Sequence, residues 1–239
     1  MKCINCYSNK LKKIFTLGSQ PISSAFYKNK KFNLKKYPLN LFECSKCKLV
    51  QFSTKTPVGE MYGRNYGYKT SLSTNMIQHL YKKYLRLNKK LNLKENSNII
   101  DIGSNDGSFL NFFASKNRKN KIFGIDPSAQ VFKKNYKKKI FLINDFFSKS
   151  KLLSFIKKKK LKIRKFSLIT SFAMFYDLLK PNSFCRDINN LLSENGLWVS
   201  EFSYFPLLLK NLTYDQICHE HISYYTLSVF KKIAEKNKL

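Results

Sequence analysis

The chain has 239 residues, 43% of them hydrophobic, which is enough for one core with a smaller appended unit and excludes wholesale disorder. It holds no apolar run near the roughly 20 residues of a membrane helix and no signal-peptide pattern, so no membrane contact is expected and the expected location is cytoplasmic. The net charge of +31 comes almost entirely from lysine, with only five arginines. Because specific phosphate and base recognition favours arginine, nucleic acid is not the expected partner.

Two pairs of cysteines come first in chain order, each with two residues between its members. They are Cys3 with Cys6 and Cys44 with Cys47. This spacing turns both sulfurs of a pair toward one point, and two pairs supply the four thiolates of a closed tetrahedral zinc site. Short extended patterns between the pairs are typical of a zinc ribbon. Four ligands leave no open coordination position, so the predicted zinc is structural.

The middle of the chain predicts an α/β unit that binds a nucleotide. A helix beginning near Thr74 is followed by an apolar strand at 98–102, a turn with glycines, and a helix from about Asp106. Further strand patterns alternate with helical ones, at 121–126, 140–145, 166–177 and 196–204. The predicted fold class is therefore α/β, a doubly wound, mostly parallel, Rossmann-like sheet with an N-terminal zinc ribbon.

The turn after the strand at 98–102 has the backbone chemistry of a cofactor loop. Gly103 and Gly107 allow a tight turn and a close approach of the backbone to a ligand. Asn105 stands where such loops often carry another glycine, and asparagine tolerates the left-handed conformation better than most residues. The Gly-Lys-Ser/Thr sequence of a phosphate-binding P-loop is absent.

Carboxylates distinguish between two classes of cofactor. A dinucleotide would require the G-x-G-x-x-G pattern, whereas this loop begins with Asp101. An acidic residue suits a cofactor with a positive end, which favours S-adenosylmethionine: its ammonium can meet Asp101, while Asp126 can take the ribose hydroxyls. Asn144 and Asp145, at the end of the strand at 140–145, complete the predicted cofactor-binding set.

Near the end of the chain, "TYDQICHEHISYYT" at 213–226 places Glu220 between His219 and His221. Histidine titrates near neutrality, so this cluster could contain a general base. Two histidines two residues apart could instead ligate a metal, or either could be a structural histidine in a loop. The residue types alone leave these alternatives open.

The whole chain resembles the zinc-ribbon-containing, S-adenosylmethionine-dependent C-methyltransferases, typified by enzymes that methylate carbon on nucleotide-linked keto-deoxysugars. The resemblance lies, in chain order, in "CINC…LGSQPISSAFY…CSKCKLVQ", "MYGRNYGYKTSLSTNM", "IIDIGSNDGSFL", "GIDPS", "NDFF", "AMFYDL" and "ICHEHISYYTL". It implies a methyltransferase of deoxysugar biosynthesis that acts on a small-molecule sugar nucleotide. It also implies three parts: a zinc ribbon at 1–60, a linker and helix at 61–95, and an S-adenosylmethionine-binding domain at 96–239.

The resemblance assigns roles to particular side chains. In that family the His-Glu-His segment lines the substrate pocket, so His221 would remove the proton beside the sugar ketone, and Glu220 would orient it or bind the sugar. Tyr66 and Tyr68 resemble the family's substrate-side tyrosines and would be donors to the enolate oxygen.

The end of the chain departs from the family pattern. Methyltransferase sheets usually close with further strands, and the relatives carry another C-terminal domain, whereas this chain stops at "LSVFKKIAEKNKL". A C-terminally truncated enzyme is therefore expected, with a partner chain as one possible source of the missing part. Two other functions stay open: an RNA methyltransferase that uses the ribbon and the basic charge to hold RNA, and a non-catalytic module that binds S-adenosylmethionine.

Overall fold

The computed structural model describes residues 1–24, 34–53, 56–62, 66–91, 93, 96–116 and 119–239. The chain forms two compact units, neither of which is one continuous stretch. Unit 1 comprises Met1–Gly67, Ala173–Arg186 and Glu201–Leu239, and unit 2 comprises Tyr68–Phe172 and Asp187–Ser200.

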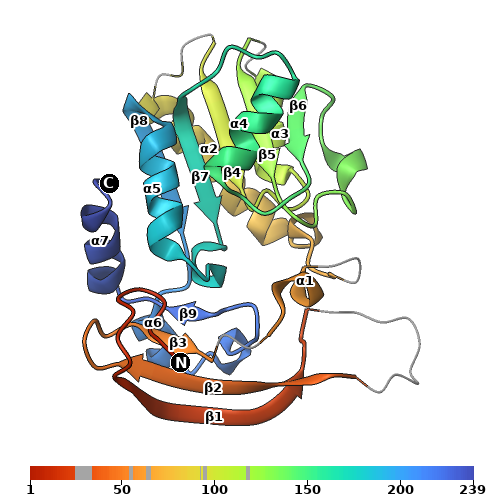
Figure 1. The fold of residues 1–239 in the computed structure, drawn as a ribbon. Coiled ribbons are helices and arrows are strands. Elements are labelled where there is room, and N and C mark those ends of the chain that lie inside the picture. The colour runs from red at the N-terminus through yellow and green to blue at the C-terminus, as the bar shows by residue number, and fades with distance from the viewer. Residues whose placement is uncertain (25–33, 54–55, 63–65, 92, 94–95, 117–118) are drawn as a thin grey trace. The chain divides into compact units, whose positions relative to one another are not determined.

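Unit 2 is built on a five-stranded sheet flanked by helices (Figure 1). Its strands are β4 (Asn98–Ile102), β5 (Lys121–Ile125), β6 (Ile140–Ile143), β7 (Phe166–Phe172) and β8 (Leu192–Glu201). The spatial order is β6-β5-β4-β7-β8, and β5 pairs in parallel with β4 and β6, as β4 does with β7. Connections leave β4 toward both sides, so the switch point where such folds bind ligands lies at its carboxyl end. The predicted doubly wound sheet is confirmed.

The core of unit 2 follows from the apolar strands and one amphipathic helix. Ile99, Ile100 and Ile102 are at most 1% exposed, as expected for a central parallel strand covered on both faces. Helix α2 (Thr74–Leu91) begins where the sequence predicts and buries Leu80, Tyr84 and Leu87 at helical spacing, in one cluster with the apolar face of α3. The other helices that contribute to the unit are α3 (Ser108–Lys116), α4 (Lys149–Lys158) and α5 (Pro181–Leu191).

Several predicted boundaries differ from the structure: the strand predicted at 196–204 spans Leu192–Glu201, and two other differences have local reasons. Helix α3 starts at Ser108 and not at Asp106, because an Asp106 carboxylate oxygen accepts hydrogen bonds from the Ser108 backbone N–H at 3.1 Å and from its hydroxyl at 2.6 Å. The strand predicted at 166–177 ends at Phe172, because Ala173 takes a left-handed backbone with φ of 51°.

Unit 1 contains a four-stranded sheet in the order β1-β2-β3-β9. Its strands are β1 (Leu11–Pro21), β2 (Lys36–Cys44), β3 (Val50–Phe52) and β9 (Ser223–Tyr224). The long antiparallel pair of β1 and β2 forms a curved ribbon (Figure 1). Strand β9, which begins two residues after His221, pairs antiparallel with β3, so it lies in the same sheet as the cysteine-bearing ribbon.

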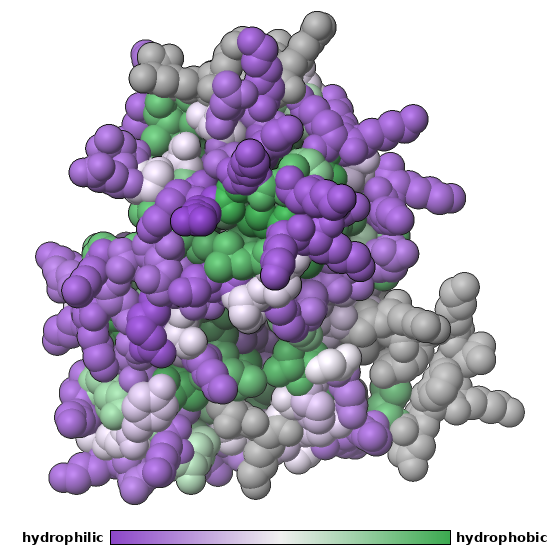
Figure 2. Space-filling model, turned by 45° about the horizontal axis from the view of Figure 1, so that its top comes forward, coloured by the Kyte–Doolittle hydropathy of each residue, from purple (hydrophilic) through white to green (hydrophobic). Residues whose placement is uncertain are grey.

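The remaining elements are short or lie at the end of the chain. They are α1 (Val58–Met61), α6 (Phe205–Lys210), α7 (Leu227–Lys236) and the 3-10 turns η1 (Thr70–Leu72), η2 (Lys133–Asn135), η3 (Phe175–Asp177) and η4 (Tyr214–Gln216). Within the described ranges, no helix has both the length and the apolar character needed to cross a membrane. Hydrophilic side chains cover most of the face in Figure 2, with smaller hydrophobic areas between them, in keeping with the net charge of +31.

Candidate active site and metal centre

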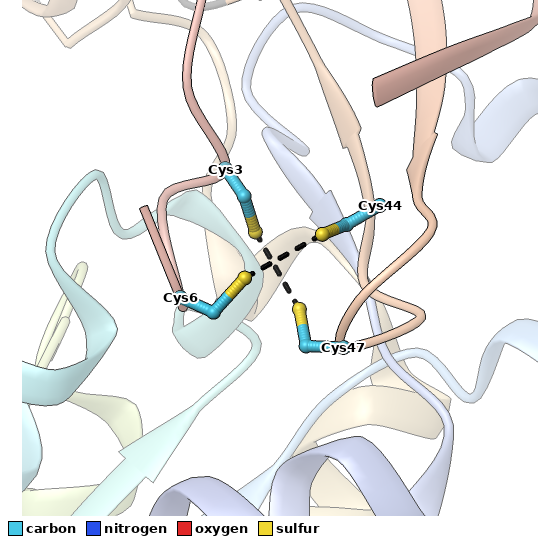
Figure 3. A group of neighbouring side chains, drawn as sticks. All are labelled: Cys3, Cys6, Cys44 and Cys47. Atoms are coloured by element: carbon cyan, nitrogen blue, oxygen red, sulfur yellow. Dashed lines mark hydrogen bonds between the residues drawn. The ribbon is translucent and has the colours of Figure 1, made fainter. Parts of the chain in front are cut away.

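Four cysteine sulfurs of unit 1 converge on one point (Figure 3). The Sγ atoms of Cys3 and Cys47 are 3.5 Å apart, as are those of Cys6 and Cys44, and all four lie within 4.8 Å of one another. Zinc–sulfur bonds of about 2.3 Å in a tetrahedron place the sulfurs about 3.8 Å apart, so the group fits a zinc ion. With four thiolates the site is closed, which suits a structural metal.

The two cysteine pairs sit in the same type of turn. The backbone N–H of Tyr7 donates to the carbonyl of Cys3 at 2.9 Å, and that of Lys48 donates to the carbonyl of Cys44 at 2.8 Å. Tyr7 and Lys48 both have left-handed backbones, with φ of 60° and 63°. This turn closes each pair and directs its sulfurs to the same side, which is the physical basis of the predicted spacing rule.

The other two cysteines have no comparable surroundings. Burial raises the pKa of Cys185 and of Cys218 to about 12 each, so both thiols are protonated at neutral pH. Neither thiol is therefore an activated nucleophile.

The glycine loop of unit 2 has the tight geometry that the sequence predicts. Gly103 and Gly107 both have φ of 77°, and Asn105 has φ of 46°, which confirms the left-handed conformation expected for it. A Cβ atom on Gly107 would lie 2.6 Å from the ring of Tyr136, so the position accepts glycine alone. The Tyr136 hydroxyl also donates to the carbonyl of Asn105 at 2.7 Å.

Asp101 is buried near the end of β4. It is 4% exposed, and its Oδ1 accepts a hydrogen bond from the Thr170 hydroxyl at 2.6 Å. Burial raises the pKa of Asp101 to about 7; the Thr170 bond lowers it and the nearby Asp126 raises it. A positively charged ligand group would stabilise the ionised form of this carboxyl, which is the chemistry expected for an ammonium partner.

Asp126 follows β5 and is hydrogen-bonded to the backbone of the glycine loop. Its Oδ2 accepts the Asn105 backbone N–H at 2.9 Å, and its Oδ1 accepts the Ser128 N–H at 2.7 Å and the Ser128 hydroxyl at 2.5 Å. Burial raises the pKa of Asp126, and these hydrogen bonds oppose the rise. A carboxylate has about four acceptor positions, so room for a ribose hydroxyl is left.

Asn144 and Asp145, which follow β6, lie nearer the surface. The Asn144 Oδ1 accepts the Gln130 backbone N–H at 2.8 Å. Asp145 Oδ1 forms an ion pair with Lys151 Nζ at 2.6 Å. Both residues follow a strand of the parallel sheet, as predicted, at the edge where ligands bind in this type of fold.

Glu220 is held as a carboxylate in unit 1. Its Oε2 accepts the Ser23 hydroxyl and its Oε1 accepts the Ser24 backbone N–H, both at 3.0 Å. Burial alone would raise the pKa of Glu220, but the bonds from Ser24, from its own backbone N–H and from Ser23 outweigh it and lower the pKa. Glu220 is therefore ionised at neutral pH.

His221 has a defined tautomer. Its Nδ1 lies 3.0 Å from the carbonyl oxygen of Gln216, which can only accept, so Nδ1 carries the proton and Nε2 carries the lone pair. Burial lowers the pKa of His221, while the Gln216 bond and the charges of Glu220 and Asp215 raise it. The ring packs at 4.2 Å from that of Tyr176. His221 is thus a neutral imidazole with the lone pair of a base.

His219 is more deeply buried than His221 and contacts a backbone carbonyl through its other ring nitrogen. It is 4% exposed, and its Nε2 lies 3.1 Å from the carbonyl of Tyr37. The segment is turned at this point, since the His221 N–H donates to the Cys218 carbonyl at 3.2 Å, so the two histidines do not form the extended ligand pair that was one alternative. Among the residues that the structure describes, the four ribbon cysteines form the one group able to hold a metal.

The two predicted tyrosines fall in different units. The Tyr66 ring packs at 5.4 Å from that of Tyr62, whose hydroxyl donates to Asp177 Oδ2 at 2.7 Å, all in unit 1. Tyr68, the first residue of unit 2, has a half-exposed side chain and a carbonyl that accepts the Asn105 Nδ2–H at 3.1 Å.

Sequence reasoning missed the partners of these side chains. Ser23 and Ser24 lie in a segment that carries the family resemblance, and that could have pointed to them. Tyr136 and Gln216 had no pattern of their own, because a single residue that contacts a distant loop leaves no periodic signal.

Comparison with known proteins defines the class. A family model described as a methyltransferase domain matches residues 74–239, and the chain belongs to this family. A second family model, for a zinc binding domain, matches residues 3–62. The cofactor of this class is S-adenosylmethionine, and the carboxylates and glycine loop at the ends of β4 and β5 fit it.

Individual relatives are more distant. Over 203 residues the chain is 24% identical to the C-methyltransferase NovU of Streptomyces niveus, covering 85% of this chain and 47% of that protein. The chain thus spans about half the length of that curated relative. The plantazolicin methyltransferase BpumL, in crystal structures with SAH and a pentazolic or triazolic desmethylPZN analog, shares the fold with a TM-score of 0.51 in both cases. Identity is 16% and 17%, and both cover 68% of this chain and 64% of that one.

Proposed function

We propose that this protein transfers a methyl group from S-adenosylmethionine to a carbon atom beside the ketone of a nucleotide-linked sugar. The observation that carries the proposal is the state of His221. The Gln216 carbonyl fixes the proton on Nδ1, and burial keeps the ring neutral, so Nε2 presents a lone pair. The distant similarity to a C-methyltransferase supports carbon as the atom that is methylated.

Carbon methylation needs such a base. A C–H bond beside a carbonyl must lose its proton before the carbon has an electron pair with which to attack, whereas the oxygen of a sugar hydroxyl already carries lone pairs. In this mechanism His221 Nε2 takes the proton, and the electron pair moves onto the ketone oxygen as an enolate. S-adenosylmethionine held by Asp101 and Asp126 would supply the methyl group, whose bond to sulfur would break as its bond to the sugar carbon forms, with S-adenosylhomocysteine as the leaving group. The ionised Glu220 stabilises the imidazolium that forms.

The other predicted residues have supporting roles in this proposal. Asp101 binds the cofactor ammonium and Asp126 the ribose, with Asn144 and Asp145 as further cofactor contacts. Tyr66 and Tyr68 are candidate donors to the enolate oxygen, where positioned hydroxyls contribute most. The glycine loop lets its backbone approach the cofactor closely, and the four cysteines hold the zinc that stabilises the ribbon.

Exchange of the substrate proton with solvent tests the proposal without requiring methyl transfer. In D2O with SAH, the wild-type chain should exchange the proton beside the ketone of at least one member of a panel of nucleotide-linked keto-deoxysugars. His221→Ala should reduce this exchange by about 100-fold or more, the usual contribution of a general base. His79→Ala, in the exposed part of α2, is the matched control and should exchange normally. Unchanged exchange in His221→Ala, or none with any sugar of the panel, would contradict the proposal.

A further inference from the structure

The side chain of Asn105 makes three hydrogen bonds to a neighbouring segment of unit 2, Tyr68–Ser71, here called the clamp segment. Its Oδ1 accepts the Thr70 backbone N–H at 2.9 Å and the Thr70 hydroxyl at 3.1 Å. Its Nδ2 donates to the Tyr68 carbonyl at 3.1 Å. Asn105 is 8% exposed, so these bonds are shielded from water, and both acceptor positions of its Oδ1 are used by Thr70.

Asp106, the next residue of the loop, holds the same segment. Its Oδ2 accepts the Ser71 backbone N–H at 2.9 Å, while its Oδ1 caps α3 through Ser108. Asp106 is 1% exposed. Two consecutive loop side chains therefore bind consecutive residues of the clamp segment, and both are removed from solvent.

The loop backbone is fixed from its other side. Asp126 accepts the Asn105 N–H at 2.9 Å, and the Tyr136 hydroxyl donates to the Asn105 carbonyl at 2.7 Å. The left-handed backbone of Asn105, with φ of 46°, is what directs its N–H and carbonyl to these partners while its side chain reaches the clamp segment. Any ligand that orders this backbone also orders the amide that holds Thr70.

We propose that Asn105 is a positioning residue that couples occupation of the cofactor loop to the placement of Tyr68. Cofactor binding reduces the backbone motion of Gly103–Gly107. Because the Asn105 amide is hydrogen-bonded to the clamp segment, the motion of that segment, whose first residue is Tyr68, is reduced as well. A tyrosine that is half exposed and held through its backbone thus becomes ordered when the cofactor is present. The inference concerns the cofactor step and does not require the sugar substrate of the proposed function.

Amide hydrogen exchange of the full, zinc-loaded chain with and without SAH tests this coupling. The Ser71 N–H is the reporter, because its acceptor Asp106 is untouched when Asn105 is changed. In the wild type, SAH should slow exchange of this amide at least about fivefold, the lower range of coupling between two sites. In Asn105→Gly, which keeps the left-handed backbone but lacks the amide group, SAH should still protect 103–108 but slow the Ser71 amide less than about twofold.

A control and a second variant keep the outcome interpretable. Asn111→Ala removes an asparagine that also cross-links backbone, at the Asn135 carbonyl and the Lys137 N–H, but has no bond to the clamp segment; it should behave like the wild type. Thr70→Val deletes one Asn105 bond from the segment side and leaves the loop intact, so it should reduce the protection even if Asn105→Gly fails to bind SAH. Ser71 protection that is absent in the wild type, or unchanged in both variants, would overturn the inference.

Discussion

Val50 lies opposite Tyr224 in the antiparallel pair of β3 and β9, which joins the cysteine ribbon to the strand that follows His221. The Phe52 N–H also donates to the Ile222 carbonyl at 2.8 Å, and the rings of Phe52 and Tyr224 pack edge to face at 5.6 Å. The two ends of the chain thus form one folded unit, in which zinc can stabilise the candidate base.

Loss of the zinc site should therefore expose the region around Glu220 and His221. Cys44→Ser removes one of four thiolates, and because zinc binding and folding are coupled, we expect loss of bound zinc and a lower melting temperature. Trypsin should cleave after Lys210, in the same unit, at a clearly higher rate. Cys185→Ala, which changes a cysteine outside the cluster, should keep the zinc. Metal analysis and timed proteolysis measure both effects, and an unchanged cleavage rate in zinc-free Cys44→Ser would refute the link.

Affinity for the cofactor should depend on pH through Asp101. The pKa of this carboxyl is about 7 without a ligand, and an ammonium partner favours its ionised form. SAH affinity should therefore rise with pH up to about 7 and fall by as much as about tenfold per pH unit below it. Asp101→Asn should bind more weakly and without this dependence between pH 5.5 and 8. Calorimetric titration with SAH at several pH values measures this dependence. If the affinity of the wild type and of Asp101→Asn changed with pH in the same way, Asp101 would not be the carboxyl that binds the ammonium.

The same substitution should stabilise the cofactor-free chain at alkaline pH. The folded-state pKa of Asp101 is raised above its ordinary value of 3.8, so its contribution is most favourable below pH 4 and is lost as pH rises to about 7. Above that, the cost of the buried charge is at most about 4 kcal/mol. Asp101→Asn should unfold at a higher temperature than the wild type at pH 8 and show little gain at pH 4. Thermal unfolding at the two pH values is the measurement. An equal increase in unfolding temperature at pH 4 and pH 8 would show that the buried charge of Asp101 is not what destabilises the wild type.

Gly107→Ala should abolish SAH binding. The substitution places a Cβ against the Tyr136 ring and forces alanine into a left-handed backbone, which alone costs roughly 1–2 kcal/mol. Gly59→Ala is the matched control, because a Cβ there meets nothing within 4 Å and the residue lies in α1. Calorimetry and thermal unfolding of both variants test the prediction. Normal SAH binding by Gly107→Ala would mean that the loop is not the cofactor site.

The pH dependence of proton exchange should report the pair of Glu220 and His221. His221 must be neutral to act as a base, and burial lowers its pKa below the ordinary value of 6.5, so exchange should be lost only as pH falls through that lowered pKa. The charge of Glu220 raises this pKa, so Glu220→Gln should move the acid limb to lower pH and reduce the maximal rate. Glu235→Gln, on the surface of α7, serves as the control. A shift of the limb to higher pH in Glu220→Gln would contradict the arrangement.

The parts that the sequence predicts are those set by local chemistry. The spacing of Cys3 and Cys6 closes a turn within a few residues. The short apolar stretch at 98–102, followed by a glycine turn, is typical of a buried strand, and Asn105 tolerates a left-handed backbone better than most residues. Each of these depends on neighbours in the chain, so a pattern of residue types is sufficient to find it.

The parts that it does not predict depend on contacts between distant residues. The pairing of β9 with β3 joins positions 50 and 224, and a two-residue strand has no periodicity that would reveal its partner. Likewise, the tautomer of His221 depends on the backbone carbonyl of Gln216. Every residue has such a carbonyl, so the residue type at position 216 does not reveal the contact. Such relationships are set by tertiary packing, which residue types alone do not encode in a readable way.

Calorimetric titration of the zinc-loaded chain with SAH, with zinc content determined on the same sample, decides whether unit 2 binds the cofactor. We expect saturable binding of about one SAH per chain in the low micromolar range, with about one zinc per chain. A folded chain that carries zinc but does not bind SAH would contradict this expectation.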